Sequence, residues 1–293
     1  MITQKSFDEK NQAGKLYLVP TPIGNLGDMT FRAVNVMKQV ALIAAEDTRN
    51  TQKLLNHFDI KTKQISFHEH NTAQRIPELL AKLKAGFSIA QVSDAGMPSI
   101  SDPGHELVVA CIQNNISVVP LPGANAGITA LIASGVTPQP FYFYGFLSRK
   151  PKEQRAELAQ LKNRPEALIF YEAPHRLLKT LKNLQTVLGG SRSAALCREL
   201  TKKHEEFIRG SLDRLAGWAA ETPIRGEFVI IVSGNDQPMV QTATADPMAG
   251  LSLTQQVDRY IQAGLAVNDA IKKVAKAHQL RKQVVYNEYH HLN

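Results

Sequence analysis

Short apolar runs alternate with longer stretches of helical periodicity along the first 120 residues. The runs are rich in β-branched and aliphatic residues, and the chain between them is long enough for crossover helices. Alternation of this kind is typical of a mostly parallel sheet covered by helices. The predicted strands are residues 16–19, 41–44, 64–67, 89–92 and 117–119. The predicted helices are residues 28–39, 48–58, 72–85 and 104–114.

A second series of apolar runs begins after residue 140 and is spaced less regularly. The interval between Cys197 and Glu206 is too short for a helical crossover, so we expect at least one antiparallel pair of strands there. The second series therefore predicts an α/β domain with a mixed sheet. Its predicted strands are residues 141–146, 167–171, 194–197, 206–209 and 227–232.

The last sixty residues follow a different pattern. Residues 236–249 are rich in Gln, Thr, Asp and Pro, a composition typical of a linker. Residues 268–278 and 281–290 are predicted to form two helices that share an apolar side made of Ile271, Val274, Ala275, Val284 and Val285. The predicted organisation is an N-terminal α/β domain (15–121), a C-terminal α/β domain (122–235), a linker (236–249) and a small helical module (250–293).

Composition adds a preference for an anionic partner. Lys and Arg outnumber Asp and Glu by 34 to 26, a net charge of +8 that favours a polyanion such as RNA. The polar first fourteen residues and the shortness of the apolar runs argue against a signal peptide or a membrane span, so we expect a cytoplasmic protein. Cys111 and Cys197 lie far apart in apolar stretches, which predicts buried thiols rather than a disulfide or zinc site.

Three loops rich in small residues follow predicted strand ends, at residues 21–28, 93–98 and 120–124. In an open parallel sheet the carboxyl ends of the strands line a crevice, and glycines there let the backbone approach a ligand. The loops predict a ligand site where they meet, although each one alone is also explained as a turn with Asp94 or Asp102 capping a helix. A dinucleotide is a poor candidate, because the chain has no G-x-G-x-x-G and no P-loop.

Seven motifs resemble the ribosomal RNA small subunit methyltransferase I family. In chain order they are VPTPIGNLGDMT, AAEDTRNTQKLL, VSDAGMPSISDPG, VPLPGA, YEAPHR, RELTKKHEE and GEFVIIVSG. The terminal helix pair is similar to that family's helix-turn-helix-like module. The resemblance implies the tetrapyrrole methylase fold, two α/β domains with S-adenosylmethionine in the cleft between them. The implied activity is methylation of the 2′-hydroxyl of a decoding-centre cytidine in 16S rRNA of the small ribosomal subunit, by a homodimer.

The resemblance also implies which residues contact the cofactor. A sulfonium methyl donor carries no phosphate, so its site needs backbone hydrogen bonds, apolar walls and a carboxylate for ribose hydroxyls or the amino group. The small-residue loops offer all three. The implied cofactor residues are Gly24, Asp94, Gly96, Met97, Pro98, Ser101, Pro122, Gly123, Ala124, Tyr171, Glu172 and Gly226.

Methyl transfer to an oxygen requires positioning, exclusion of water and removal of the hydroxyl proton, and it requires no metal. The candidate bases are carboxylates near strand ends, each of which could instead cap a helix or form an ion pair: Glu46, Asp47, Asp102, Glu172 and Glu199. Of these we select Glu46 or Asp47. Metal binding by His68 and His70 is not expected, since no third ligand stands at motif spacing.

RNA contacts are expected from cations and from one histidine, which could hydrogen-bond to a base or stack on it. These residues are Arg49, His68, Arg149, Lys150, Arg155, Arg176, Lys202, Lys272 and Lys276. The aromatic residues at 141–146 and Trp218 are expected to pack in the core or between domains. Lys272 and Lys276 share a helix face, so the terminal module is expected to dock on RNA, with a purely structural or dimer-stabilising role as the alternative.

Two other classes of function remain open. A small-molecule methyltransferase of tetrapyrrole type would share the fold and the cofactor but would have little use for the basic segments. A ribosome assembly factor without enzymatic activity would use the basic segments and leave the ligand site idle. Incubation of labelled cofactor with small ribosomal subunits separates these classes from an rRNA methyltransferase, because only an rRNA methyltransferase would transfer label to the RNA.

Overall fold

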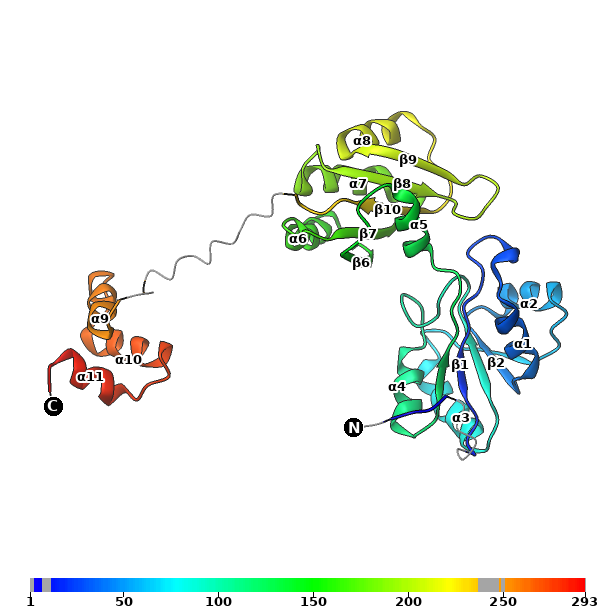
Figure 1. Cartoon of the computed structure of the whole chain (residues 1–293), viewed down its shortest axis with the longest axis horizontal. Helices are drawn as coiled ribbons and strands as arrows, with labels where there is room; N and C mark the ends of the chain where they lie inside the picture. Colours follow the sequence, from blue (N-terminus) through cyan, green and yellow to red (C-terminus); the bar gives the residue numbers. More distant parts are fainter. Residues whose placement is uncertain (1–2, 7–11, 237–247, 249–250, 293) are drawn as a thin grey trace. The chain divides into compact units, whose positions relative to one another are not determined.

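The computed structural model describes residues 3–6, 12–236, 248 and 251–292. The chain divides into two compact units, residues 1–236 and residues 237–293 (Figure 1). The first unit contains two five-stranded sheets, and the second contains helices alone among its described residues. Most of the predicted linker, residues 237–247 and 249, lies outside the described residues.

The first sheet is entirely parallel, with strand order β3-β2-β4-β1-β5. Its central strand β4 is buried along its whole length, as its apolar sequence requires when helices cover both faces of a parallel sheet. The parallel sheet predicted from the alternation is therefore confirmed. The strands are β1 (Leu16–Leu18), β2 (Leu42–Ala45), β3 (Gln64–Ser66), β4 (Ile89–Val92) and β5 (Val118–Pro120).

Two pairs of helices cover this sheet (Figure 1). Met37 of α1 and Leu55 of α2 pack in one core cluster, and Leu79 of α3 and Leu107 of α4 pack in another. The first helix begins later than predicted, because residues 26–28 form a 3-10 turn and the Thr30 hydroxyl then caps α1. The helices are α1 (Phe31–Gln39), α2 (Thr48–His57), α3 (Thr72–Lys84) and α4 (His105–Gln113).

The second sheet is mixed, with strand order β6-β7-β10-β8-β9. Strand β10 is antiparallel to both β7 and β8, and β8 and β9 form the antiparallel pair expected from their short connection. Among the described strands of this sheet, only β6 and β7 are parallel to each other. The strands are β6 (Phe141–Phe146), β7 (Ala167–Glu172), β8 (Ser193–Arg198), β9 (Glu206–Ser211) and β10 (Phe228–Val232).

Four helices that the hydrophobic pattern did not predict cover the second sheet. Ala130 and Leu131 of α5 pack on one face, while α6, α7 and α8 contribute Leu158, Leu181 and Leu215 to the core on the other. A 3-10 turn, Pro174–Arg176, leads from β7 into α7. The helices are α5 (Ala126–Ser134), α6 (Pro151–Leu161), α7 (Leu177–Leu188) and α8 (Leu212–Glu221).

The second unit has three described helices rather than the two predicted. The additional helix α9 begins at Ser252, whose side chain and that of Gln255 form a capping box. Val284, predicted to share the apolar side, is instead 47% exposed, while Val285 is buried beside Ile271. No described helix combines the length and apolar character needed to cross a bilayer. The helices are α9 (Leu253–Gln262), α10 (Val267–Ala277) and α11 (Lys282–Tyr289).

Candidate active site

A cavity of about 530 Å³ opens in the first unit where strands of both sheets end. The first sheet contributes residues that follow β2 and β4, and the second contributes the ends of β6 and β7 and the start of β10. Its volume and mostly apolar lining are typical of a small-molecule site. The lining residues are Ile23, Glu46, Asp94, Ala95, Gly96, Met97, Ile100, Ser101, Asp102, Asn125, Ala126, Phe146, Tyr171, Glu172, Ala173, Pro174, His175, Cys197, Leu200, Lys202, Glu227, Phe228 and Val229.

The loop after β4 forms one wall of the cavity and is held by a buried side chain. The Gln91 amide donates to the Ser99 hydroxyl and to the Pro103 carbonyl, both at 3.0 Å. Gly104 has φ of +136°, and a Cβ there would fall 1.6 Å from Gln91 Nε2. Thr21 and Gly96 exchange backbone hydrogen bonds of 3.0 and 2.9 Å. The small residues of this loop thus allow the backbone to pack closely against Gln91 and Thr21, and these contacts fix the loop beside the cavity.

Carboxylates from two strand ends meet in the cavity wall. The Asp94 backbone N–H donates to Glu46 Oε2 at 3.2 Å, and the Asp47 N–H donates to Asp94 Oδ1 at 3.2 Å. Burial raises the pKa of the Glu46 carboxyl, and the hydrogen bond from the Asp94 N–H opposes this rise. The negative charges of Asp102, Asp94 and Asp47 raise the Glu46 pKa further. Burial also raises the pKa of Asp102. Glu46 is therefore a stronger proton acceptor than an ordinary glutamate.

Asp47, the other candidate base, has a different environment. Its side chain caps α2 by accepting from the Arg49 backbone N–H at 2.8 Å, and it forms an ion pair of 2.7 Å with the Arg49 guanidinium. These hydrogen bonds lower the pKa of Asp47 to about 2. Asp47 does not line the cavity, whereas Glu46 does. The geometry favours Glu46 of the two.

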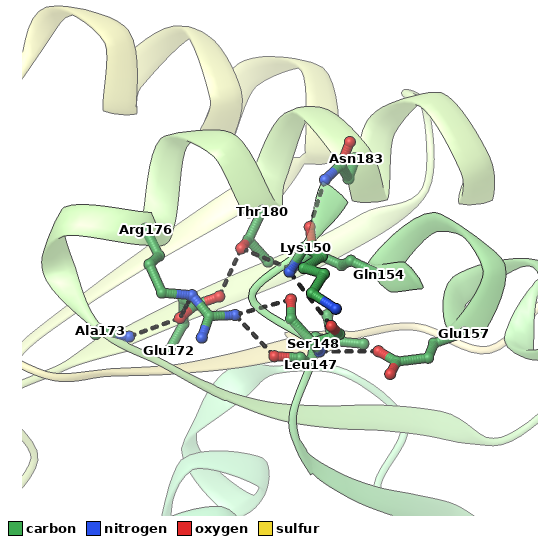
Figure 2. Close-up of polar contacts among 10 residues, drawn as sticks. All are labelled: Leu147, Ser148, Lys150, Gln154, Glu157, Glu172, Ala173, Arg176, Thr180 and Asn183. Atoms are coloured by element: carbon green, nitrogen blue, oxygen red, sulfur yellow. Dashed lines mark hydrogen bonds and ion pairs between the residues drawn. The ribbon is translucent and has the colours of Figure 1, made fainter. Parts of the chain in front are cut away.

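Glu172 reaches the cavity from β7 but is engaged in a buried polar network (Figure 2). Its carboxylate accepts from the Thr180 hydroxyl at 2.5 Å and from the Ala173 N–H at 2.9 Å, and it pairs with Arg176 at 3.1 Å. Gln154 of α6 donates to Thr180 and accepts from Asn183. Glu172 is 2% exposed, so the network joins the end of β7 to α6 and α7 inside the protein.

A second charged group lies where β8 and β10 approach the cavity. Lys202 pairs with Glu199 at 3.0 Å and with Glu227 at 2.7 Å, and the Glu227 N–H donates to Glu199. The hydrogen bond from that N–H lowers the pKa of Glu199, and Lys202 adds to the effect. A Cβ on Gly226 would fall 2.4 Å from Glu199 Cγ, so this glycine gives room to the chain's own ion pairs.

The structure brings part of the predicted cofactor set to the cavity. Asp94, Gly96, Met97, Ser101, Tyr171 and Glu172 line it. Gly24 instead lines a shallow neighbouring hollow with Lys202 and Lys203. Gly123 packs against Pro20, where a Cβ would come within 2.6 Å of the proline ring. The predicted residues outside the cavity lining are Gly24, Pro98, Pro122, Gly123, Ala124 and Gly226.

Several cations predicted to bind RNA already have partners within the protein. Arg176 donates to the carbonyls of Leu147 and Ser148 as well as pairing with Glu172, and Lys150 pairs with Glu153 at 2.9 Å. Arg155 donates to Asn183 at 3.3 Å, Arg49 pairs with Asp47, and Lys202 pairs with Glu199 and Glu227. Arg149, Lys272 and Lys276 are exposed. His68 lies in the turn that Asn71 closes after β3.

The sequence prediction missed several lining residues, among them Ile100, Phe146, His175 and Leu200. Phe146 and His175 lie at or just after strand ends, which is the signal that could have identified them. Cys197 also lines the cavity, but burial raises its thiol pKa to about 12, and both cysteines are free and buried as predicted. Among the described residues, no three or more His, Cys, Asp or Glu side chains are grouped as metal ligands.

The architecture defines the class of protein. Residues 15–216 match the family of tetrapyrrole (corrin/porphyrin) methylases. Solved structures of the same fold include a uroporphyrin-III C-methyltransferase from Thermus thermophilus complexed with S-adenyl homocysteine, with a TM-score of 0.53 and 16% identity over 75% of this chain and 97% of that one. The cobalt precorrin-4 methyltransferase CbiF has a TM-score of 0.57 at 14% identity, over 75% and 94% of the two chains.

Curated relatives narrow the class. The chain is 54% identical to the ribosomal RNA small subunit methyltransferase I of Streptococcus pyogenes serotype M1, over 100% of both chains. It is 51% identical to the protein of that name from Bacillus subtilis (strain 168), over 98% of both chains. The chain therefore belongs to the ribosomal RNA small subunit methyltransferase I family, within the tetrapyrrole methylases.

Proposed function

We propose that this protein transfers a methyl group from S-adenosylmethionine to the 2′-hydroxyl of a decoding-centre cytidine in 16S rRNA of the small ribosomal subunit. The observation that carries the proposal is a cavity in which a carboxylate of raised pKa, Glu46, lies beside the small-residue loop 93–104. Full-length relatives at 54% identity, named for the small-subunit rRNA, support the choice of substrate.

The cavity residues fit this cofactor by their chemistry. Asp94 offers a carboxylate to ribose hydroxyls or to an amino group, and Gly96, with φ of +75°, brings backbone without a side chain to the cavity wall. Ile23, Met97 and Leu200 supply apolar walls for an adenine ring. S-adenosylmethionine would supply a methyl group on a positively charged sulfur, which an oxygen nucleophile can displace.

In the proposed mechanism Glu46 accepts the proton of the ribose 2′-hydroxyl as the oxygen gains its methyl group. Its raised pKa makes it a stronger base than an ordinary glutamate. With cofactor and RNA bound, the mostly apolar lining would limit the access of water, which would otherwise compete with the hydroxyl. The leaving group is a neutral thioether once the sulfonium has lost its methyl group. It therefore needs no metal ion to stabilise it, and no metal takes part in the proposed mechanism.

The wider setting belongs to the same proposal. The protein would act in the cytoplasm on the small subunit, and the exposed Arg149, Lys272 and Lys276 would contact phosphates of the RNA. A homodimer is expected from the family resemblance. Measuring the mass of the full chain in solution tests the dimer directly.

Transfer of label tests the function. Small subunits from a strain lacking the gene are incubated with the protein and with S-adenosylmethionine labelled on its methyl group. The proposal predicts label in 16S rRNA, and pretreating the enzyme with a chelator should leave the rate unchanged. Label confined to a tetrapyrrole would indicate the small-molecule alternative, and sedimentation with subunits without any transfer would indicate an assembly factor.

A further inference from the structure

Phe146 is an exposed aromatic residue of the cavity lining. It is 56% exposed, although it ends a strand whose tyrosines, Tyr142 and Tyr144, pack against the core beneath α6, α7 and α8. Alternation along a regular strand would place residue 146 on that same core face. The sequence analysis expected the aromatic residues at 141–146 to pack in the core or between domains, whereas Phe146 is more than half exposed and lines the cavity.

A bulge in β6 explains why Phe146 faces the cavity. Phe143 pairs with Ile169, but the next paired residue is Gly145, which has φ of +84°, so the register shifts by one position. Phe146 is consequently paired with Tyr171, whose ring lies on the cavity side. The extra residue turns Phe146 from the core face to the cavity face, which is a recognised use of bulges beside active sites.

The position of Phe146 is supported by one ring contact and by the fixed backbone that follows it. The Phe146 ring packs edge-on against the Tyr171 ring at 5.5 Å and 69°, and the Tyr171 hydroxyl accepts from the Gly127 N–H at 3.0 Å. Directly after Phe146, the carbonyls of Leu147 and Ser148 are fixed by Arg176 (Figure 2). An aromatic surface fixed before binding loses little conformational entropy when a ligand stacks on it.

The chemistry around this ring fits a nucleotide of single-stranded RNA. Arg149 is exposed three residues further on, and His175 lines the same cavity next to Arg176. An aromatic face with cations beside it is how proteins bind unstacked bases and their phosphates. The methyl donor carries no phosphate, so the exposed Arg149 favours the RNA over the cofactor adenine. Ile100, 63% exposed in the same lining, offers a second apolar surface.

We infer that Phe146 is the surface on which the base of the acceptor nucleotide stacks, so that the ribose is presented to the cavity. The inference rests on the proposed function, because it takes RNA as the substrate. It assigns a binding role to a side chain for which packing alone was expected. Arg176 then acts as a positioning residue, since it fixes the segment from which Phe146 projects.

The test measures affinity for small subunits lacking the modification, with S-adenosylhomocysteine present so that no chemistry is needed. Phe146→Ala should weaken this binding by about tenfold to a hundredfold, the range that stacking of one base contributes. Phe146→Trp should restore affinity to within about threefold of wild type, because it keeps a stacking face. Phe87→Ala is the matched control, since Phe87 is 55% exposed but precedes β4, at the opposite end of that strand from the cavity.

Affinity for S-adenosylhomocysteine, measured by calorimetry on each variant, separates the two possible ligands. We expect it to stay within about twofold of wild type in Phe146→Ala, because the ring is assigned to the RNA. A loss of cofactor affinity with unchanged subunit binding would overturn the inference and assign the ring to the adenine. Equal subunit binding by Phe146→Ala and Phe87→Ala would overturn it as well. The proposed function fails separately, if wild-type protein transfers no label to RNA.

Discussion

At the scale of single residues, two adjacent carboxylates acquire opposite properties from their surroundings. Glu46 points into the cavity, where burial and three neighbouring carboxylates raise its pKa. Asp47 turns away to cap α2 and bind Arg49, which lowers its pKa to about 2. The sequence led us to select this pair as candidate bases, but it could not separate the two. The rise in the Glu46 pKa comes from burial and from carboxylates distant in the chain, Asp94 and Asp102, whose positions the sequence does not give.

The first prediction concerns Glu46. Glu46→Gln should lower kcat by about 10²- to 10⁴-fold, the usual contribution of a general base. In the wild type, kcat/KM should rise with pH through a pKa above the ordinary glutamate value of 4.5, since only the carboxylate form accepts a proton. Rate profiles between acid and neutral pH check both points.

The control for Glu46 is Asp47→Asn, which keeps a side chain able to cap α2 and should retain the wild-type kcat. Because this variant removes one of the charges that raise the Glu46 pKa, its pH profile should keep its shape and shift toward lower pH. If Glu46→Gln retained the wild-type kcat and its dependence on pH, the base would have to be another group, with Asp102 the next carboxylate of raised pKa in the cavity.

The second prediction concerns Asp94, which accepts from the Asp47 N–H and from Asn50 while it lines the cavity. Asp94→Asn should weaken S-adenosylhomocysteine binding by about tenfold to a hundredfold, because charge-assisted hydrogen bonds are removed. Calorimetric titration measures the change. Asp269→Asn in α10 is a control that should bind normally, and an Asp94→Asn affinity equal to that control would remove Asp94 from the cofactor site.

At the scale of elements, periodicity predicted all ten strands of the described residues to within about a residue or two, but only about half of the described helices. The sequence analysis did not predict α9 because the segment is rich in polar residues. Its capping box, Ser252 with Gln255, would have indicated where the helix begins. The glycines of the loops were harder. A Cβ on Gly123 or Gly226 would meet Pro20 or Glu199, so each glycine makes room for the chain itself, and a contact with the cofactor stays a prediction. The sequence alone cannot distinguish a glycine that admits a ligand from one that admits the chain.

The third prediction tests the network that joins β7 to α6 and α7. Glu172→Leu should destabilise the fold by about 3–5 kcal/mol, because it leaves the Arg176 charge without its buried partner. Thr180→Val, which removes one hydrogen bond, should cost about 1 kcal/mol. Urea unfolding followed by circular dichroism gives both values.

The comparison variant for this network is Glu153→Gln, which removes the solvent-exposed pair with Lys150 and should change stability little. A Glu172→Leu protein as stable as Glu153→Gln, but with weakened cofactor binding, would show that Glu172 serves the ligand and not the packing of these elements.

At the scale of the whole molecule, the chain combines a first unit that contains the cavity with a small second unit that carries exposed lysines. The core of the second unit is its own, formed by residues such as Val257, Ile271 and Val285. We therefore expect the first unit to carry out the methyl transfer and the second unit to bind the RNA.

The fourth prediction is that a chain ending at Asp236 keeps its cofactor affinity but binds small subunits more weakly. The weaker binding should appear in the kinetics mainly as a higher KM for the small subunit. The slope of log affinity against log salt should become shallower by about one for each RNA phosphate that the shortened chain no longer neutralises. In the full chain, Lys272→Glu with Lys276→Glu should act in the same direction. Lys82→Glu with Lys84→Glu on α3 is the charge-matched control.

Unchanged subunit binding by the shortened chain would contradict the docking role. If the shortened chain instead became monomeric and bound the cofactor more weakly, the module would be dimer-stabilising, and measuring its mass in solution beside the titration distinguishes the two results.

The most direct test of the central claim is the identity of the modified nucleoside. Small subunits from a strain lacking the gene are treated with the protein and S-adenosylmethionine, and the 16S rRNA is digested to nucleosides and analysed by mass spectrometry. The account predicts one new product, a cytidine whose added methyl group remains with the ribose when the base is released. A methyl group that leaves with the base, a modified nucleoside other than cytidine, or no new product at all would contradict it.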